Sequence, residues 1–222
     1  MVDLAAWHSM LIELHSGTLT LATICILAII LDRIHLRMSG NRKKPSSFWS
    51  TDSSMGKLSR YTDPTAYISG ILGVIGLVTS AIVGIYVWPI ELITSSALGL
   101  NKVMFSIFAT ELWIIFIFMR SKYGENLWKK SAMATIYSFL GILGFLCIVI
   151  AGSLGAHMTV LGAQLPELTK KGSIIDPIYA LFGIDPLTFG VTGSDFMIIL
   201  IVVSIVLLVV PLAMILYLQR RK

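Results

Sequence analysis

Residues 132–157 read AMATIYSFLGILGFLCIVIAGSLGAH, a run without Asp, Glu, Lys or Arg. About 20 apolar residues in an α-helix span the roughly 30 Å of hydrocarbon in a bilayer, so this run is long enough to cross a membrane. The whole chain has the same character, because 56% of its 222 residues are hydrophobic, 13% are charged and the mean hydropathy is +0.85. A water-soluble globule of this composition would expose large apolar patches. The sequence therefore predicts an integral membrane protein.

Four further stretches have the length and hydropathy of membrane-spanning helices. With residues 132–157 they predict one all-α domain over residues 1–222, a bundle of five transmembrane helices. The predicted spans are residues 10–31, 66–88, 102–119, 132–157 and 196–218. Thr62-Asp63-Pro64 predicts the start of the second helix, since a capping side chain and a proline favour a helix start. Pro211 predicts a kink in the last helix.

The distribution of basic residues predicts how these helices are oriented. Of the 17 Lys and Arg residues, 14 lie in segments 32–65 and 120–131 or after the fifth span, and only Lys102, Lys170 and Lys171 lie on the other side. Because cytoplasmic segments carry an excess of Lys and Arg, we expect the N-terminus outside and the C-terminus in the cytoplasm of a cell membrane. The basic residues lie in short segments between apolar runs, which argues against a nucleic-acid surface. No cleavable signal peptide is recognised, so we expect the first helix to stay in the membrane.

The predicted outer segment, residues 158–195, contains a short repeated pattern. Ile175-Asp176-Pro177-Ile178 is followed nine residues later by Ile184-Asp185-Pro186-Leu187. Asp followed by Pro is a helix-start signal, so the pattern predicts short helices on the outer surface. These helices would either cover the bundle or dock a partner.

Three of the four histidines are predicted at the outer side, and they are the main candidate ligands. His8 and His15 are seven residues apart and share a helix face, while His157 ends the fourth span at about the depth of His15. Neutral imidazoles on two facing helices are suited to axial ligation of a b-type haem, with His15 and His157 as the ligands. The small residues of Ala151–Ala156 would leave room for the macrocycle.

Other interpretations of these residues stay open. A metal site of His8, His15 and His157 is one, and copper bound with Met10 or Met158 is a variant of it, since imidazole and thioether suit that metal. His8 beside Trp7 is also typical of interfacial anchoring. The small residues of Ala151–Ala156 would equally let two helices approach closely.

Small residues in the second span predict close helix packing. Gly76, Ser80 and Gly84 recur at four-residue spacing, which allows helix backbones to approach in a membrane. Cys25 and Cys147 each lie within an apolar run and far from any metal-binding spacing, so we interpret both as packing residues.

Glu111 is the one acidic residue deep within a predicted span. A carboxylate there is costly unless it is protonated, paired or next to a polar cavity. We therefore consider Glu111 a candidate proton-relay group. The alternative is a protonated side chain bonded to a Ser or Tyr of a neighbouring helix or subunit.

Several of these features together resemble a known group. They are His15-Ser16-Gly17, the glycine-rich second helix, the stretch from Asn101-Lys102 to Trp128, and Gly152-Ser153-Leu154-Gly155. Over residues 8–160 the chain resembles small prokaryotic four-helix membrane proteins predicted to bind b-type haem, similar in style to cytochrome b561. The resemblance implies haem ligation by His15 and electron transfer. The second, third and fifth spans lack histidine, so at most one bis-histidine haem fits.

Three functions follow from this reading. The first is a membrane subunit of a redox complex that carries one b-type haem near the outer face. The second is a cofactor-free accessory subunit that scaffolds a membrane enzyme, such as a respiratory complex or a copper monooxygenase. The third is a small transporter or channel that uses Glu111. No nucleophile–base pair or nucleotide-binding glycine pattern is found, which favours a non-catalytic or electron-transfer subunit over a self-contained enzyme.

Overall fold

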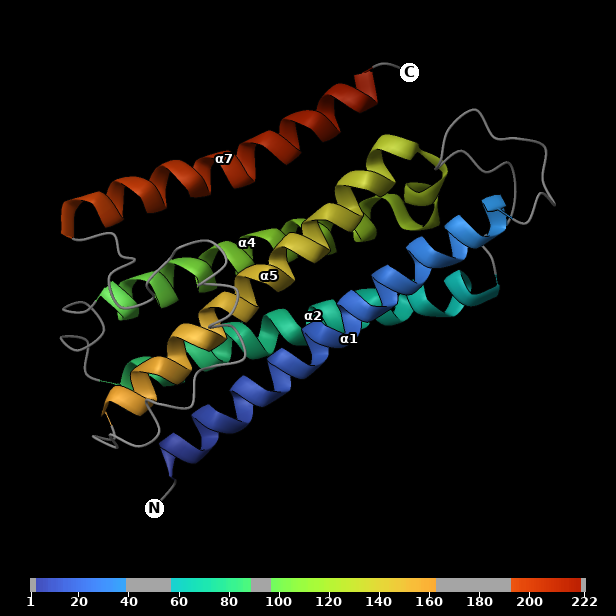
Figure 1. The fold of residues 1–222 in the computed structure, drawn as a ribbon. Helices are drawn as coiled ribbons and strands as arrows, with labels where there is room; N and C mark the ends of the chain where they lie inside the picture. The colour runs from blue at the N-terminus through green and yellow to red at the C-terminus, as the bar shows by residue number, and fades with distance from the viewer. Residues whose placement is uncertain (1–2, 39–56, 89–96, 163–192, 221–222) are drawn as a thin grey trace.

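The computed structural model describes residues 3–38, 57–88, 97–162 and 193–220, and these residues are almost entirely helical. The helices are α1 (Leu4–Met38), α2 (Lys57–Val87), α4 (Ala97–Tyr123), α5 (Ser131–Gly162) and α7 (Gly193–Arg220), with a 3₁₀ turn, η1 (Gly124–Lys129), after α4. Figure 1 shows α1, α2, α4 and α5 side by side, α7 alongside α4, and the two chain ends at opposite ends of the bundle. Over the described ranges no strand occurs, which confirms the all-α prediction.

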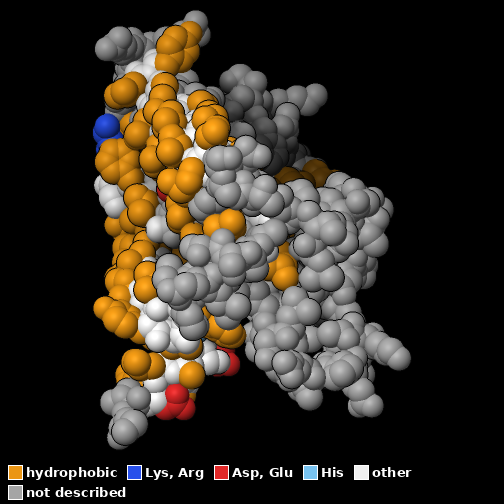
Figure 2. All heavy atoms as spheres, turned by 90° about the vertical axis from the view of Figure 1, so that its left-hand side faces the viewer, with side chains coloured by type: hydrophobic (Ala, Val, Ile, Leu, Met, Phe, Trp, Pro, Cys, Tyr) orange, Lys and Arg blue, Asp and Glu red, His pale blue; other side chains and the backbone are white. Residues whose placement is uncertain are grey.

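Four of these helices are long and apolar enough to cross a membrane. The qualifying segments are Leu4–His35, Leu58–Val87, Leu98–Lys129 and Ala132–Ala156. The described apolar part of α7 is shorter, Met197–Ala213, and it contains Pro211 within the helix. Hydrophobic side chains cover much of the described surface in Figure 2, as expected where a helix faces lipid instead of water.

The helices extend past two predicted segment boundaries, and the predicted start of the second helix at Thr62-Asp63-Pro64 was wrong. Residues 32–65 were expected to form a loop, but α1 continues to Met38 and α2 already begins at Lys57. Pro64 therefore lies inside α2, and Asp63 does not cap the helix, because its carboxylate is bound by side chains of α4 and η1. The helices also extend into the predicted segment 158–195, since α5 runs to Gly162 and α7 starts at Gly193. The short helices predicted around Asp176 and Asp185 lie outside the described residues.

Helix α1 packs against glycines of α2, as the spacing of these glycines predicts. A Cβ atom added at Gly76 would lie 3.0 Å from the Cβ of His15, and one added at Gly84 would lie 2.8 Å from Cε1 of His8. A Cβ atom at Gly73 would overlap the side chain of Leu19. Because glycine has no side chain, α1 and α2 can pack closely along most of their length.

Glycines on α5 bring that helix against both α1 and α4. A Cβ atom at Gly141 would overlap Ile26 of α1 and would lie 3.3 Å from Phe116 of α4. At Gly144 it would lie 2.9 Å from Cδ1 of Trp113. The core between these helices contains fully buried aromatic residues, and Phe116 stacks on Tyr137 with ring centroids 4.0 Å apart. The first and fourth predicted spans are therefore neighbours.

Helix α7 is the least enclosed element. It packs mainly against α4, and Leu200, Val203 and Leu207 are the residues that touch the buried core. Most of its other described side chains are exposed. Both cysteines are buried and free, which agrees with their interpretation as packing residues.

Candidate functional site

Three nitrogen-bearing side chains gather at one end of the bundle, which we call the histidine end. It comprises His8 and His15 of α1 and Lys102 of α4, together with the α2 and α5 backbones that they touch. Lys102 lies close enough to both imidazoles to act on them electrostatically. The opposite end, which we call the arginine end, contains Arg33 and Arg120.

His15 is buried, and its ring is held by the backbone of its own helix. Its Nδ1 lies 2.7 Å from the carbonyl oxygen of Leu11, one turn towards the start of α1. A carbonyl oxygen only accepts, so Nδ1 is the donor of this bond. In a neutral ring the lone pair then lies on Nε2. Metal-bound histidines almost always donate their other ring N–H to a carboxylate, a backbone carbonyl or water, and the bond to Leu11 is of this kind.

His8 has the same bond but a different setting. Its Nδ1 lies 3.1 Å from the carbonyl oxygen of Ser80, and its ring rests on Gly84. His15 packs on Gly76, which lies about two turns from Gly84 on the same face of α2, so the prediction that His8 and His15 share a helix face is confirmed. The His8 ring joins α1 to α2, so its main visible role is helix packing.

The backbone of His157 belongs to α5, while its side chain lies outside the described part of the structure. Ile26 of α1 contacts Gly141 of α5, so these two residues lie at the same depth in the bundle and define a reference level. At 1.5 Å per residue, His15 lies about 16 Å and His157 about 24 Å from this level, both towards the histidine end.

Lys102 is held between α4 and α5. Its Cε and Nζ atoms each lie 3.1 Å from the position of a Cβ atom at Gly155, so a side chain at this position would require the end of the lysine to shift by a few tenths of an ångström. Gly155 is two residues before His157 in α5. The lysine therefore lies at the level of the candidate ligands.

A complete metal site is not formed by the described residues. Within ranges 3–38, 57–88, 97–162 and 193–220, no group of three His, Cys, Asp or Glu side chains is close enough to hold an ion. Met10 is exposed, and the Met158 side chain falls outside the described set, as does that of His157. The proposed metal set of His8, His15 and His157 stays a prediction.

Glu111 faces α7. Its carboxyl group hydrogen-bonds to Ser204, while its Oε2 atom is buried without a partner among the described residues. The bond to a serine of a neighbouring helix agrees with the structural alternative for this residue. A role in proton relay stays a prediction.

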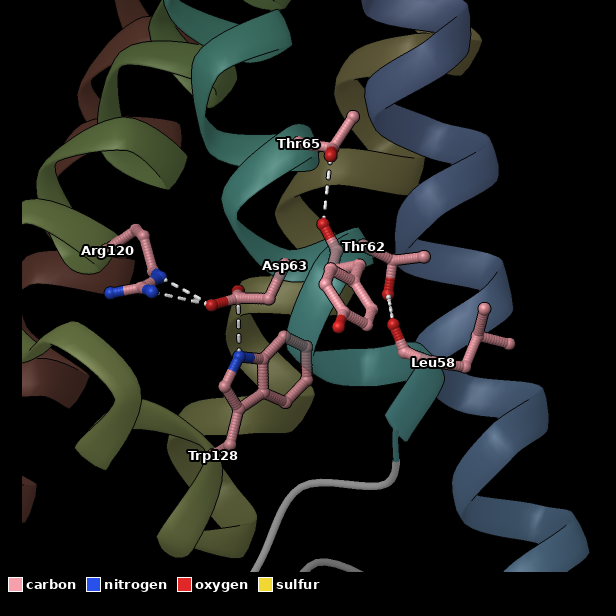
Figure 3. A network of polar contacts seen from close by, with 7 residues as sticks. Leu58, Thr62, Asp63, Thr65, Arg120 and Trp128 are labelled. Atoms are coloured by element: carbon pink, nitrogen blue, oxygen red, sulfur yellow. Dashed lines mark hydrogen bonds and ion pairs between the residues drawn. The ribbon is translucent and has the colours of Figure 1, made fainter.

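The sequence analysis missed a buried polar network at the arginine end. Asp63 is fully buried, and Arg120 binds its Oδ2 atom through Nε at 2.8 Å and Nη2 at 2.6 Å, while Trp128 donates to Oδ1 through Nε1 at 2.8 Å. Figure 3 shows Arg120 and Trp128 approaching Asp63 from two sides. The Arg33 guanidinium stacks on Trp128, 5.0 Å from the ring centroid. The sequence did contain a signal for this network, because Asp63 and Arg120 are an acid and an arginine at the same expected depth of adjacent spans.

Comparison with protein families, curated proteins and solved structures finds no match to this chain.

Proposed function

We propose that this protein is a five-span subunit of a redox complex in the cell membrane and holds one b-type haem between His15 and His157. The proposal rests on one observation above all. The His15 ring is buried at the histidine end with Nδ1 on the Leu11 carbonyl, which leaves Nε2 as the ligand atom. The contact between α1 and α5 supports it, because both candidate ligands must come from neighbouring helices. A bound haem would supply one-electron transfer.

The same proposal places the histidine end at the outer face. Arg33, Arg120, Lys122 and Lys129 belong to the arginine end, whereas Lys102 is the basic residue at the histidine end among those described. The positive-inside rule then puts the arginine end in the cytoplasm. Opposite positions of the two chain ends support an odd number of crossings.

An absorption spectrum tests the haem. The full chain, purified with its native partners, is expected to show a Soret band that shifts on reduction with dithionite. His15→Ala and His157→Ala should each abolish the band, because each removes one axial ligand. His35→Ala is the matched control, since His35 is an exposed histidine near the other end of α1. A colourless wild-type complex, or a band that survives His15→Ala, would overturn the proposal.

A cofactor-free accessory subunit is the second candidate, and exposure of α5 and α7 favours it. A Cβ atom at Gly152 would meet nothing within 4 Å, so this glycine is open to a helix from outside the chain. Most of the described side chains of α7 are likewise exposed. A colourless protein that co-purifies with other subunits in fixed stoichiometry would support this candidate, and Gly152→Leu should then weaken the association.

A further inference from the structure

Four aromatic rings touch one another in sequence through the core of the bundle. Trp113 lies edge-on to Phe116 of the same helix, with ring centroids 4.9 Å apart. Phe116 stacks on Tyr137 of α5 at 4.0 Å, and Tyr137 lies edge-on to Trp128 of η1 at 5.3 Å. All four side chains are buried, with an exposed fraction of 1% or less. These rings, which we call the aromatic chain, connect the middle of α4 with the arginine end inside the protein core.

The two indoles at the ends of the aromatic chain are the groups best suited to lose an electron. Tryptophan and tyrosine are the most easily oxidised aromatic side chains, whereas the ring of Phe116 is inert. A tyrosine loses an electron readily only when its phenol proton can leave, and the Tyr137 hydroxyl has no hydrogen-bond partner among the described residues. Phe116 and Tyr137 are therefore suited to bridge the two indoles, and Trp113 and Trp128 to hold the radical.

Trp128 differs from Trp113 in having a proton acceptor. Within the described part of the chain, Nε1 of Trp113 has no hydrogen-bond partner. Nε1 of Trp128 donates to Oδ1 of Asp63 at 2.8 Å, which is within reach for proton transfer (Figure 3). Arg120 binds the other carboxylate oxygen, Oδ2, so Oδ1 is the atom placed to take the proton. The Arg33 guanidinium, 5.0 Å from the Trp128 ring centroid, opposes positive charge on the indole and favours loss of the proton with the electron.

We propose that the aromatic chain carries an oxidising equivalent from the lipid-facing middle of α4 to Trp128, where it rests as a neutral indolyl radical. The oxidant is a lipid peroxyl radical, which an electron from Trp113 and a proton from the membrane surface reduce to the hydroperoxide. Trp128 then returns one electron to Trp113 along the chain. The N–H bond of Trp128 breaks, and its proton forms an O–H bond on Oδ1 of Asp63. This inference goes beyond the proposed function and does not depend on a bound haem.

The test places a photo-oxidant at the Trp113 end of the aromatic chain. Ile114 is 49% exposed, so Ile114→Cys can carry a ruthenium polypyridine next to Trp113 without disturbing the core. Both native cysteines are buried, so the label attaches at the introduced one. A laser flash with an external quencher generates ruthenium(III) in the full chain in nanodiscs, and transient absorption follows the radical. The neutral indolyl radical should appear as ruthenium(II) is regained, and Trp128→Phe should abolish it.

The bridging rings and the proton acceptor are tested with separate variants. Phe116→Leu and Tyr137→Leu should slow the appearance of the radical, whereas Tyr137→Phe should not, because the ring remains. Phe139→Leu is the matched control, since Phe139 is a 61% exposed aromatic residue of α5 outside the aromatic chain. Asp63→Asn should abolish the neutral radical, because an amide does not take up the indole proton.

A second label position keeps all four rings and so does not depend on the folding of a core variant. The same label on Ile82→Cys, an exposed position of α2 near the histidine end, should give no Trp128 radical. The inference is overturned if the Ile114→Cys chain forms no radical, if the radical persists in Trp128→Phe, or if both label positions give equal yields. Equal rates in Phe116→Leu and Phe139→Leu would overturn it as well. The haem absorption band is used in none of these measurements, so the proposed function stands or falls separately.

Discussion

Removal of the Asp63 carboxylate should be among the most destabilising single changes in this protein. Asp63→Ala leaves the Arg120 guanidinium and the Trp128 indole N–H without their shared acceptor. Breaking a buried ion pair costs about 3–5 kcal/mol, and the lower end applies here because the Arg120 side chain is 14% exposed. The orphaned indole adds roughly 1–2 kcal/mol, which gives an expected loss of about 4–5 kcal/mol in the free energy of unfolding.

The assay is unfolding in mixed micelles, with helix content followed as the fraction of denaturing detergent rises. Asp63→Asn should lose less, about 2–3 kcal/mol, because the amide oxygen still accepts from Trp128. Glu125→Gln is the matched control, since Glu125 is an exposed acid in η1, and it should stay within about 0.5 kcal/mol of wild type.

A double-mutant cycle separates the ion pair from the remaining packing. Asp63→Ala combined with Arg120→Met should be less destabilising than the sum of the single changes by at least about 1 kcal/mol, because the two residues contact each other. Additive effects, or an Asp63→Ala variant as stable as Glu125→Gln, would refute the reasoning.

Three further predictions use the same unfolding assay. Gly76→Val should cost about 1–3 kcal/mol, because its side chain would meet His15, whereas Gly17→Val should not, since a Cβ atom there meets nothing within 4 Å; equal losses would contradict the packing of α1 on α2. Tyr137→Phe should be neutral or stabilising by about 1 kcal/mol, because its buried hydroxyl has no hydrogen-bond partner among the described residues, and a clear loss of stability would show that one exists. Glu111→Gln should stay within about 0.5 kcal/mol of wild type, since a neutral acid and an amide both bond to Ser204; a loss above 1 kcal/mol would indicate that the ionised carboxylate is the stabilising form.

The sequence predicted helix class and the positions of the apolar segments well. Residues 132–157 lie within α5, the spans 10–31, 102–119 and 196–218 lie within α1, α4 and α7, and the span 66–88 lies within α2 except for its last residue. The free energy of moving a segment from water to lipid is a sum over its own side chains. It can therefore be judged from consecutive residues without knowledge of tertiary contacts. The four-residue spacing of Gly76, Ser80 and Gly84 also predicted a helix contact, because it defines one face of a single helix.

Helix ends and polar partners were less predictable. Thr62-Asp63-Pro64 has the pattern of a helix start, yet α2 passes through it, because Asp63 is bound by Arg120 and Trp128 instead of capping the helix. A proline usually interrupts a helix. Here the interhelical hydrogen bonds and ion pair of the preceding residue, Asp63, outweigh that preference. The position of Lys102 on Gly155 was also missed, since those residues are 53 positions apart.

The sequence alone determined that the chain forms apolar helices long enough to cross a bilayer and that three of its four histidines lie at the opposite ends of them from most of its arginines. Only the tertiary structure decided which helices touch, that the His15 ring is buried with Nδ1 on the Leu11 carbonyl, and that Asp63 and Lys102 lie between helices. The physical reason is that the preference for lipid is a sum over neighbouring residues, whereas each interhelical contact depends on the rotation and depth of two helices that are distant in the chain.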